Sequence, residues 1–378
     1  MRVAFFYGPM CLSFRGSLDL PNCETDPRGL SGSEWGIIRT AEEVAKLGHE
    51  VHLYTLTDQV GLHRGIHVHS FEDRHRDSFD VAIAWNDPRD LIGVRADLRV
   101  CEQCLNSFEY CPKNVEDLVD LWTSPSEAHR QMVLGQEHVL ALDHNGEPGA
   151  MLWHDSAKWV TVELGCDLPI PTAKLWKTPG RVIYTSSPDR GLHWLLQEWP
   201  AIRRAVPHAH LRIFYRLKPW IDGFKGTGYY PPIEPLRDRA VYIEDALRRL
   251  EGHGVEVVDS VSREQIRKEQ MEAMVLAYPL DPIRWTEGFS CSVLEACAAE
   301  ACPVITDVDA FPTLYGALDP VPRGDWAAFR ERVIRVLTDE CYRFDMNEAA
   351  TKLAEEKTWK KRATKLMAVI QTRQSGAT

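Results

Sequence analysis

Two glutamates, Glu287 and Glu295, lie in the stretch "WTEGFSCSVLEACAAEACPVITD" at residues 285–307. The apolar residues that follow the first glutamate keep a helical period, so a helix begins near Ser290 to Ser292. The N–H groups in the first turn of a helix have no partner within it and suit a phosphate group, and Gly288 permits close approach of a ligand. The spacing therefore predicts a diphosphate at the helix start, with a carboxylate on each side that accepts hydrogen bonds from hydroxyl groups.

Other interpretations of the two glutamates remain open from this stretch alone. The segment "SVLE" at residues 292–295 fits a capping box, in which Glu295 only accepts a hydrogen bond from the backbone of the helix cap. Glu287 can simply favour the positive end of the helix dipole. A pair of glycosidase carboxylates requires an acid and a base or nucleophile on either side of a scissile bond. A helix start between the two carboxylates makes a phosphate the more natural ligand.

A second segment that suits an anion is "RGLSGSEWG" at residues 28–36, whose glycines, Gly32 among them, precede a helical pattern. The dinucleotide fingerprint requires G-x-G-x-x-G directly after the first strand. Here about twenty residues follow Tyr7 before the first of these glycines, and the glycine spacing differs. A nicotinamide-dependent dehydrogenase is therefore disfavoured. The alternative is a loop that ends in a helix N-cap, with Ser31 or Ser33 as the cap.

The rest of the sequence indicates which strands and helices position these segments. Short apolar runs alternate with longer helical patterns, and this alternation is typical of βα units and a largely parallel sheet. The predicted strands are residues 2–7, 50–56, 80–85 and 97–102 in the first half, and 181–187, 210–215, 255–260, 274–280 and 303–307 in the second. One predicted helix follows the glycine loop, and three others occupy about 190–205, 262–273 and 290–301. Residues after 345 are predicted to form one continuous helix.

The alternation starts twice, with a break rich in glycine and proline around residues 143–180. We therefore predict an α/β fold of two Rossmann-like domains that face each other across a deep cleft. Ligands of such sheets bind at the carboxyl ends of the strands, so the cleft is the expected site.

Composition limits the class of protein further. The chain has 378 residues, of which 44% are hydrophobic and 26% charged, as in ordinary globular proteins. Its net charge of -11 disfavours a nucleic-acid partner, because clustered Lys and Arg drive polyanion binding. The ten cysteines are scattered, and neither a signal-peptide layout nor a membrane-spanning apolar run is evident. We expect a reduced, cytoplasmic protein.

The stretch "EGFSCSVLEACAAEACPVI" resembles the sugar-binding signature of retaining GT-B glycosyltransferases, the glycogen-synthase-like and mannosyltransferase-like family (family four of the glycosyltransferases). Their pattern is Glu-Gly-Phe-Gly, an apolar stretch, Glu-Ala, small residues and Pro-Val-Ile. Four other segments are similar to the family in the same order: "SGSEWGIIRTAEEVAKLGHEVHLYT", "VELGCDL", "SSPDRGLHWLLQEWPAIRRAVPHAHLRIFY" and "TWKKRATKLM". The ordered matches cover most of the chain.

The resemblance implies roles for individual residues. Glu287 would contact the donor sugar, and Arg190, in the place of a family lysine, would neutralise the diphosphate; these two are the predicted catalytic residues. Glu295 would hold the ribose hydroxyls of the nucleotide. The other residues of the predicted donor site are Gly288, Phe289, Ser290, Gly32 and Lys218.

The chain also departs from the family. An arginine commonly precedes the family lysine by a few residues, whereas "VIYTSSPD" has none. A second cation must then come from elsewhere, such as Arg216 or Lys218, or be missing. Many relatives carry a histidine near the acceptor, and Glu102 or Gln103 in "VCEQCLNSF" occupies that neighbourhood. The acceptor side is therefore the least transferable part of the resemblance.

As a whole, the resemblance implies an acceptor domain at residues 1–166, a donor domain at 167–345 and a helix at 346–378 that returns to the first domain. It implies transfer of a sugar from a UDP- or GDP-linked donor, with retention and without a cofactor or metal. The acceptor stays open between a saccharide, a lipid-linked group and a small molecule. The missing arginine motivates the alternative of a non-catalytic protein that binds nucleotide-sugars.

Two further features have a simple and a functional interpretation. Cys101, Cys104 and Cys111 begin a zinc-site pattern, but no fourth ligand lies nearby in the sequence, so we interpret them as buried thiols. The run "KKRATK" at residues 360–365 can contact anionic lipids at a membrane surface. A solvated face on a packed helix is the preferred interpretation of this run.

Overall fold

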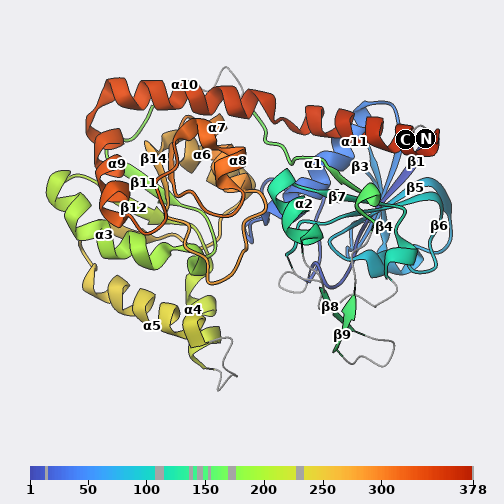
Figure 1. Cartoon of the computed structure of the whole chain (residues 1–378), viewed down its shortest axis with the longest axis horizontal. Coiled ribbons are helices and arrows are strands. Elements are labelled where there is room, and N and C mark those ends of the chain that lie inside the picture. The colour runs from blue at the N-terminus through green and yellow to red at the C-terminus, as the bar shows by residue number, and fades with distance from the viewer. Residues whose placement is uncertain are drawn as a thin grey trace. The chain divides into compact units, whose positions relative to one another are not determined.

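The structure is a computed structural model, and it describes residues 1–12, 16–106, 115–135, 139–142, 148–151, 155–168, 176–226 and 234–376 (Figure 1). The chain divides into two compact units. Unit 1 consists of Met1–Asp26, Leu30–Gly165 and Lys357–Thr378, and unit 2 of Pro27–Gly29 and Cys166–Glu356.

Unit 1 is built on an eight-stranded sheet in the order β10-β7-β6-β5-β1-β2-β4-β3. The strands of this sheet are β1 (Arg2–Tyr7), β2 (Glu50–Thr55), β3 (Gly61–His63), β4 (Ile66–Ser70), β5 (Ser78–Trp85), β6 (Arg95–Glu102), β7 (Leu121–Ser124) and β10 (Trp159–Thr161). Neighbours pair in parallel except β3 with β4, which are antiparallel. The helices are α1 (Gly32–Lys46), α2 (Glu127–Leu134) and α11 (Trp359–Gln374), and β8 (Val139–Leu142) and β9 (Pro148–Met151) form a separate antiparallel pair.

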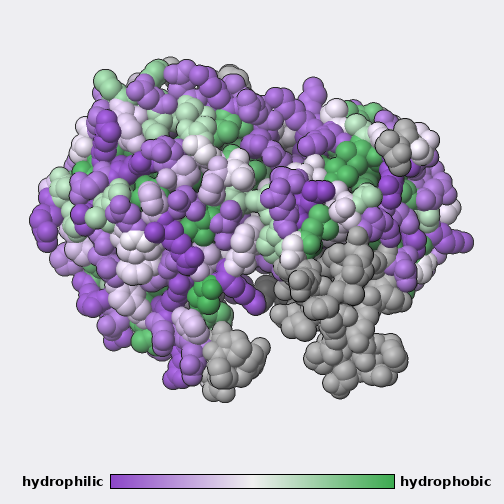
Figure 2. All heavy atoms as spheres, viewed as in Figure 1, coloured by the Kyte–Doolittle hydropathy of each residue, from purple (hydrophilic) through white to green (hydrophobic). Residues whose placement is uncertain are grey.

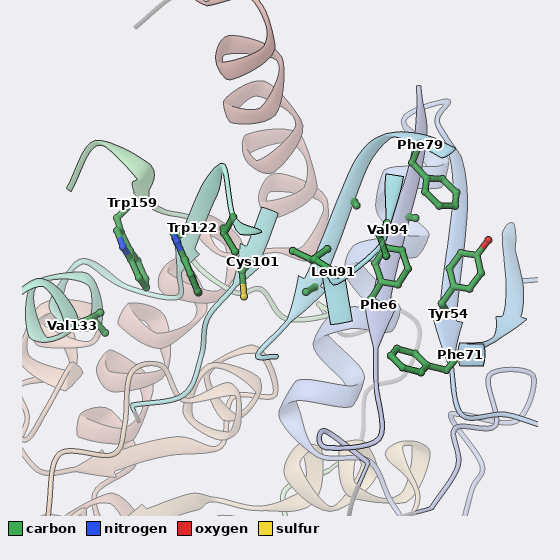
Figure 3. Packing of buried hydrophobic residues seen from close by; sticks show 14 residues of the cluster. Phe6, Tyr54, Phe71, Phe79, Leu91, Val94, Cys101, Trp122, Val133 and Trp159 are labelled. Carbon is green, nitrogen blue, oxygen red and sulfur yellow. The ribbon is translucent and has the colours of Figure 1, made fainter. Parts of the chain in front are cut away.

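Both faces of the central part of this sheet are covered, because the consecutive residues Val3 to Phe6 of β1 are all fully buried. Helix α11 packs against α1. Figure 3 shows part of the core, in which Phe6, Tyr54 and Phe79 group on β1, β2 and β5. Trp122 and Trp159, from the adjacent strands β7 and β10, stack with ring centroids 5.1 Å apart. The short strands at this edge are therefore held by side-chain packing as well as by the ladder.

Unit 2 is built on a five-stranded, fully parallel sheet in the order β13-β12-β11-β14-β15. The strands of this sheet are β11 (Arg181–Tyr184), β12 (His210–Ile213), β13 (Val255–Val257), β14 (Val275–Tyr278) and β15 (Cys302–Ile305). The α-helices of the unit are α3 (Leu192–Ala205), α4 (Leu217–Lys225), α5 (Glu234–Arg249), α6 (Arg263–Glu272), α7 (Cys291–Ala298), α8 (Phe311–Leu314), α9 (Trp326–Thr338) and α10 (Glu340–Glu356). The short 3-10 helix η5 (Pro188–Arg190) follows β11.

The prediction of an α/β fold with two Rossmann-like domains is confirmed, and all nine predicted strands are present. β1 has the predicted bounds, β5 and β6 begin two residues earlier, and the other six end one to three residues earlier. The prediction of one continuous helix after residue 345 is wrong. Helix α10 ends at Glu356, and α11 begins at Trp359. Thr358 between them has extended dihedral angles, and its side chain accepts a hydrogen bond from the N–H of Lys361. A Thr N-cap of this kind starts a new helix.

The surface carries few apolar clusters. In the view of Figure 2, hydrophilic residues cover most of the described surface, and hydrophobic residues form only small groups. Among the described residues, no helix is both long enough and apolar enough to span a bilayer.

Candidate functional site

The carboxyl ends of β11 and β14 form the centre of the candidate site in unit 2. These strands are neighbours and pair in parallel, so the segments that follow them emerge at the same edge of the sheet. Arg190 ends η5 after β11, and Gly191 follows with a φ of 115°. A Cβ atom on Gly191 would lie 1.8 Å from the carbonyl oxygen of Pro279. Glycine is therefore required for this turn to pack against the end of β14.

Glu287 and Arg190 meet at this edge. The Nη1 atom of Arg190 donates to Oε2 of Glu287 over 2.7 Å. The phenol of Tyr278, the last residue of β14, donates to the same oxygen over 2.6 Å. The Glu287 side chain is only 6% exposed, whereas that of Arg190 is 29% exposed. The pair thus joins a buried carboxylate to a cation that still reaches the surface of the unit.

Burial sets the protonation properties of Glu287. Removal from water raises the pKa of this carboxyl, while the positive charge of Arg190 and the hydrogen bond from Tyr278 act in the opposite direction. The pKa of Glu287 lies above its ordinary value as the net result. Arg190 remains charged at all relevant pH values. The net charge of the pair therefore depends on whether Glu287 is protonated.

The backbone on either side of Glu287 is fixed as well. The Oδ2 atom of Asp309 accepts hydrogen bonds from the N–H groups of Thr286 and Glu287, both over 2.9 Å. Ser290 is the N-cap of α7, and its hydroxyl accepts a hydrogen bond from the N–H of Val293 over 3.3 Å. The helix start beside Glu287 is therefore held at a defined place, within the range of Ser290 to Ser292 that the sequence predicted.

The structure rejects the capping-box interpretation of Glu295. With Ser290 as the cap, the third helical residue is Val293, so Glu295 is too far along the helix to complete a box. Its carboxylate instead forms an ion pair with Arg263 at the start of α6 and accepts a hydrogen bond from Gln270 over 3.4 Å. Glu295 therefore faces α6 across a small cavity of about 20 Å³.

The remaining predicted donor residues divide between the two units. Gly288, Phe289 and Ser290 are buried beside Glu287. Lys218 lies on α4, where its exposed ammonium group pairs with Asp222 over 2.7 Å, and within the described residues it contacts neither Glu287 nor Arg190. The structure does not bring Lys218 into this group of contacts.

A different arginine lies close to Arg190. Arg239 on α5 donates to the carbonyl oxygens of Asp189 and Asp281, the latter over 2.6 Å. It thereby connects the segment after β11, which carries Arg190, to the segment after β14, which leads to Glu287. Sequence reasoning missed Arg239, because α5 is a polar helix and nothing in its spacing identifies which strand ends it faces.

Gly32 is the first residue of α1 in unit 1, and Ser31 is the N-cap, which was one of the two expected caps. The hydroxyl of Ser31 accepts a hydrogen bond from the N–H of Glu34 over 3.2 Å, and the Glu34 carboxylate accepts one from the N–H of Ser31 over 2.7 Å. These contacts form a complete capping box. The glycine loop thus ends in a helix start, at the position that the sequence indicated.

The acceptor-side residues Glu102 and Gln103 lie below the surface of unit 1, each with 1% of its area exposed. The Glu102 carboxylate forms an ion pair with Arg362 of α11. Arg362 is itself 3% exposed, so this member of the basic run at residues 360–365 is not on a solvated face. Its other donors bind the Thr40 hydroxyl and the Val162 carbonyl oxygen, each over 2.9 Å. Glu102 thus contributes to the packing of α11 rather than to an open surface.

The cysteines form no metal centre in the part of the chain that the structure describes. Cys101 is buried and Cys104 is partly buried, while Cys111 lies outside the described residues. Within those residues, no group of three or more histidine, cysteine or acidic side chains is arranged to hold a metal ion.

Comparison with known proteins agrees with this architecture. Residues 178–339, which contain Arg190, Glu287 and Glu295, match the family described as glycosyl transferases group 1. No curated protein matches the chain significantly by sequence. Among solved structures, AviGT4, a glycosyltransferase involved in avilamycin A biosynthesis, is 16% identical with a TM-score of 0.61, and the match covers 100% of this chain and 98% of that chain.

Two further solved structures are similar over nearly their whole length. Sucrose-phosphate synthase from Thermosynechococcus elongatus is 12% identical with a TM-score of 0.66, covering 100% of both chains. HepE from Anabaena, solved in complex with UDP and glucose, is 12% identical with a TM-score of 0.62, covering 98% of this chain and 100% of that chain. The protein therefore has the fold of the GT-B glycosyltransferases, and its second unit carries the group 1 signature.

Proposed function

We propose that the protein transfers a sugar from a nucleoside diphosphate sugar to an acceptor, with retention at the anomeric carbon and without a metal ion. The observation that carries this proposal is the contact between the buried Glu287 carboxylate and Arg190, beside the start of α7. A buried carboxylate can accept hydrogen bonds from sugar hydroxyls, and a cation beside a helix start suits a diphosphate.

In this proposal the leaving group determines what the site must do. When the bond to the sugar breaks, negative charge develops on the nucleoside diphosphate, and fixed donors aimed at that charge lower the barrier. Arg190 supplies a positive charge, and the first N–H groups of α7 supply the positive end of the helix dipole. Arg239 supports this arrangement because it holds the backbone next to Arg190. These groups take the part that a metal ion has in other transferases.

The proposed donor is linked to UDP or GDP. The similarity to HepE, whose structure contains UDP and glucose, supports a UDP-linked donor. Two similar glycosyltransferase structures contain UDP, one together with GlcNAc and the other with α-GlcNAc-glycerol and fondaparinux. A saccharide is accordingly the first acceptor class to test. Retention follows from the resemblance of residues 287–305 to the retaining family.

Glu295 is proposed to bind the ribose hydroxyls of the donor. Its carboxylate is held by Arg263, and both side chains are 11% exposed. A carboxylate has about four acceptor positions on its two oxygens. Glu295 can therefore bind ribose while it keeps its contact with Arg263.

Glu295→Gln is expected to weaken the binding of UDP or GDP by about tenfold, because the ribose hydroxyls lose a charged acceptor. The shape of the side chain is kept, but Arg263 loses its charged partner, so the melting temperature should fall as well and the titration is run well below it. Isothermal titration with each nucleotide measures the effect. Glu264→Gln is the matched control, since Glu264 is an exposed glutamate on the same helix as Arg263 and the change in net charge is identical. An unchanged nucleotide affinity in Glu295→Gln would remove Glu295 from the site.

A further inference from the structure

Tyr278 joins the proposed catalytic pair to a third side chain. Its phenol donates to Oε2 of Glu287 over 2.6 Å and accepts a hydrogen bond from the hydroxyl of Ser186 over 2.8 Å. Ser186 follows β11, Tyr278 ends β14, and both residues are buried. The chain of hydrogen bonds therefore runs from Ser186 through Tyr278 to Glu287, with Arg190 on the same carboxylate oxygen.

The ring of Tyr278 is held firmly enough to give this phenol a fixed direction. The residue is 1% exposed. Its ring packs edge-on against Tyr184 and Phe311, with centroids 5.9 Å and 5.6 Å away. A ring enclosed in this way has little freedom to turn its hydroxyl elsewhere. Because the Ser186 hydroxyl occupies an acceptor position on the phenol, the phenolic proton points to Glu287.

We propose that Tyr278 is a positioning residue for the transfer reaction, and that Ser186 orients it. Tyr278 and Arg190 together hold Oε2 of Glu287, which leaves Oε1 to accept a hydroxyl of the donor sugar. Tyr278 also favours the ionised form of Glu287, since a hydrogen bond donated to a carboxylate stabilises its charged form. This inference rests on the proposed function.

The direction of the pH effect follows from the hydrogen bond. Burial raises the pKa of Glu287, and the negative charge of Asp309 raises it further, while the charge of Arg190 and the hydrogen bonds from Tyr278 and Arg190 lower it. Glu287 accepts a sugar hydroxyl best when it is ionised, so activity falls as the pH drops through this pKa. Tyr278→Phe removes the donated bond but keeps the ring. The pKa of Glu287 then rises, and the acidic limb of the pH profile moves to higher pH.

The test compares pH profiles of kcat in the full-length protein, with the UDP- or GDP-sugar that the wild type uses. Tyr278→Phe is expected to lower kcat by about tenfold at neutral pH, with a smaller change in KM, and to shift the acidic limb upward. Ser186→Ala should shift the limb in the same direction by less, because the phenol is retained. If Tyr278→Phe folds poorly, the pH profile of Ser186→Ala still tests the inference.

Tyr184→Phe is the matched control. Tyr184 ends the neighbouring strand β11, is equally buried, and donates its hydroxyl hydrogen to the carbonyl oxygen of Ser187 over 2.7 Å. Losing that bond has a structural effect only, so the acidic limb should stay in place.

Two outcomes would overturn the inference. One is a Tyr278→Phe profile that coincides with the wild type, and the other is the same shift in Tyr184→Phe. A wild-type protein that releases no nucleoside diphosphate from any donor contradicts the proposed function itself, and the positioning role with it. The wild-type measurement therefore separates the failure of the function from the failure of this inference.

Discussion

Glu287→Gln is expected to lower kcat/KM for sugar transfer by about a thousandfold, which is the size of effect seen when a group aimed at a transition state is removed. The carboxylate is buried, and two donors, Arg190 and Tyr278, meet its Oε2 atom. Glutamine keeps the size of the side chain and one oxygen acceptor. It lacks the negative charge that complements Arg190 and the donor sugar. The loss should therefore appear in the reaction more than in the folded state.

The measurement is steady-state release of nucleoside diphosphate, together with a melting curve for each variant. Glu269→Gln is the matched control, because Glu269 is also a buried glutamate of unit 2 with arginine partners, Arg181 and Arg212. Arg181 begins β11, so this second cluster lies at the opposite end of the strand from Arg190. Glu269→Gln should lower stability and leave kcat/KM near the wild-type value. Equal activity losses in both variants would refute a specific role for Glu287.

The largest effect on stability is expected for the ion pair between Glu102 and Arg362. Each side chain is 1% exposed, and Arg362 also binds Thr40 and the Val162 carbonyl group. Removing one member of a buried pair leaves the other charge without compensation and costs about 3–5 kcal/mol. Glu102→Ala should therefore lower the free energy of unfolding by this amount. Urea unfolding monitored by tryptophan fluorescence measures it.

Two comparisons make this result specific. Replacing both members, as in Glu102→Leu with Arg362→Met, removes both buried charges and should recover much of the loss. Glu50→Gln breaks an exposed ion pair with Arg2 in the same unit and should cost less than about 1 kcal/mol. A wild-type-like unfolding curve for Glu102→Ala, combined with impaired acceptor use, would instead support the acceptor-side role that the sequence suggested.

Strand positions could be predicted from the sequence because parallel strands are buried on both faces and appear as continuous apolar runs. "RVAFFY" and "DVAIAW" are examples, and both form central strands, β1 and β5. The run "LWTS" of β7 has only four residues, and its partners lie elsewhere in the chain. A strand this short depends on the strands that pair with it on either side, and its own sequence carries little signal.

The start of α7 was also predictable, since an apolar period and a serine cap are local features. The partners of the two glutamates were not. Arg263 is distant from Glu295 in the sequence, and Arg190 is distant from Glu287, so only the fold brings them together. Spacing alone could not distinguish the capping box from a side chain that faces α6. That decision depended on which serine caps the helix.

The prediction for Arg362 was wrong for a related reason. A run of four cations with only two other residues is typical of a solvated helix face. The buried partner, Glu102, lies at the end of β6, far from α11 in the sequence. A charged residue is buried in a core only when it has such a partner. The sequence of α11 alone does not show that the partner exists.

The most direct test of the proposed function is release of nucleoside diphosphate from a panel of UDP-, GDP- and ADP-sugars, measured with and without saccharide acceptors. The proposal predicts saturable release from one class of donor, stimulated by an acceptor, and a product whose anomeric configuration matches that of the donor. Saturable binding of a nucleotide-sugar without any release of nucleoside diphosphate would contradict the proposed transferase activity. It would instead indicate a non-catalytic binding protein of the same fold.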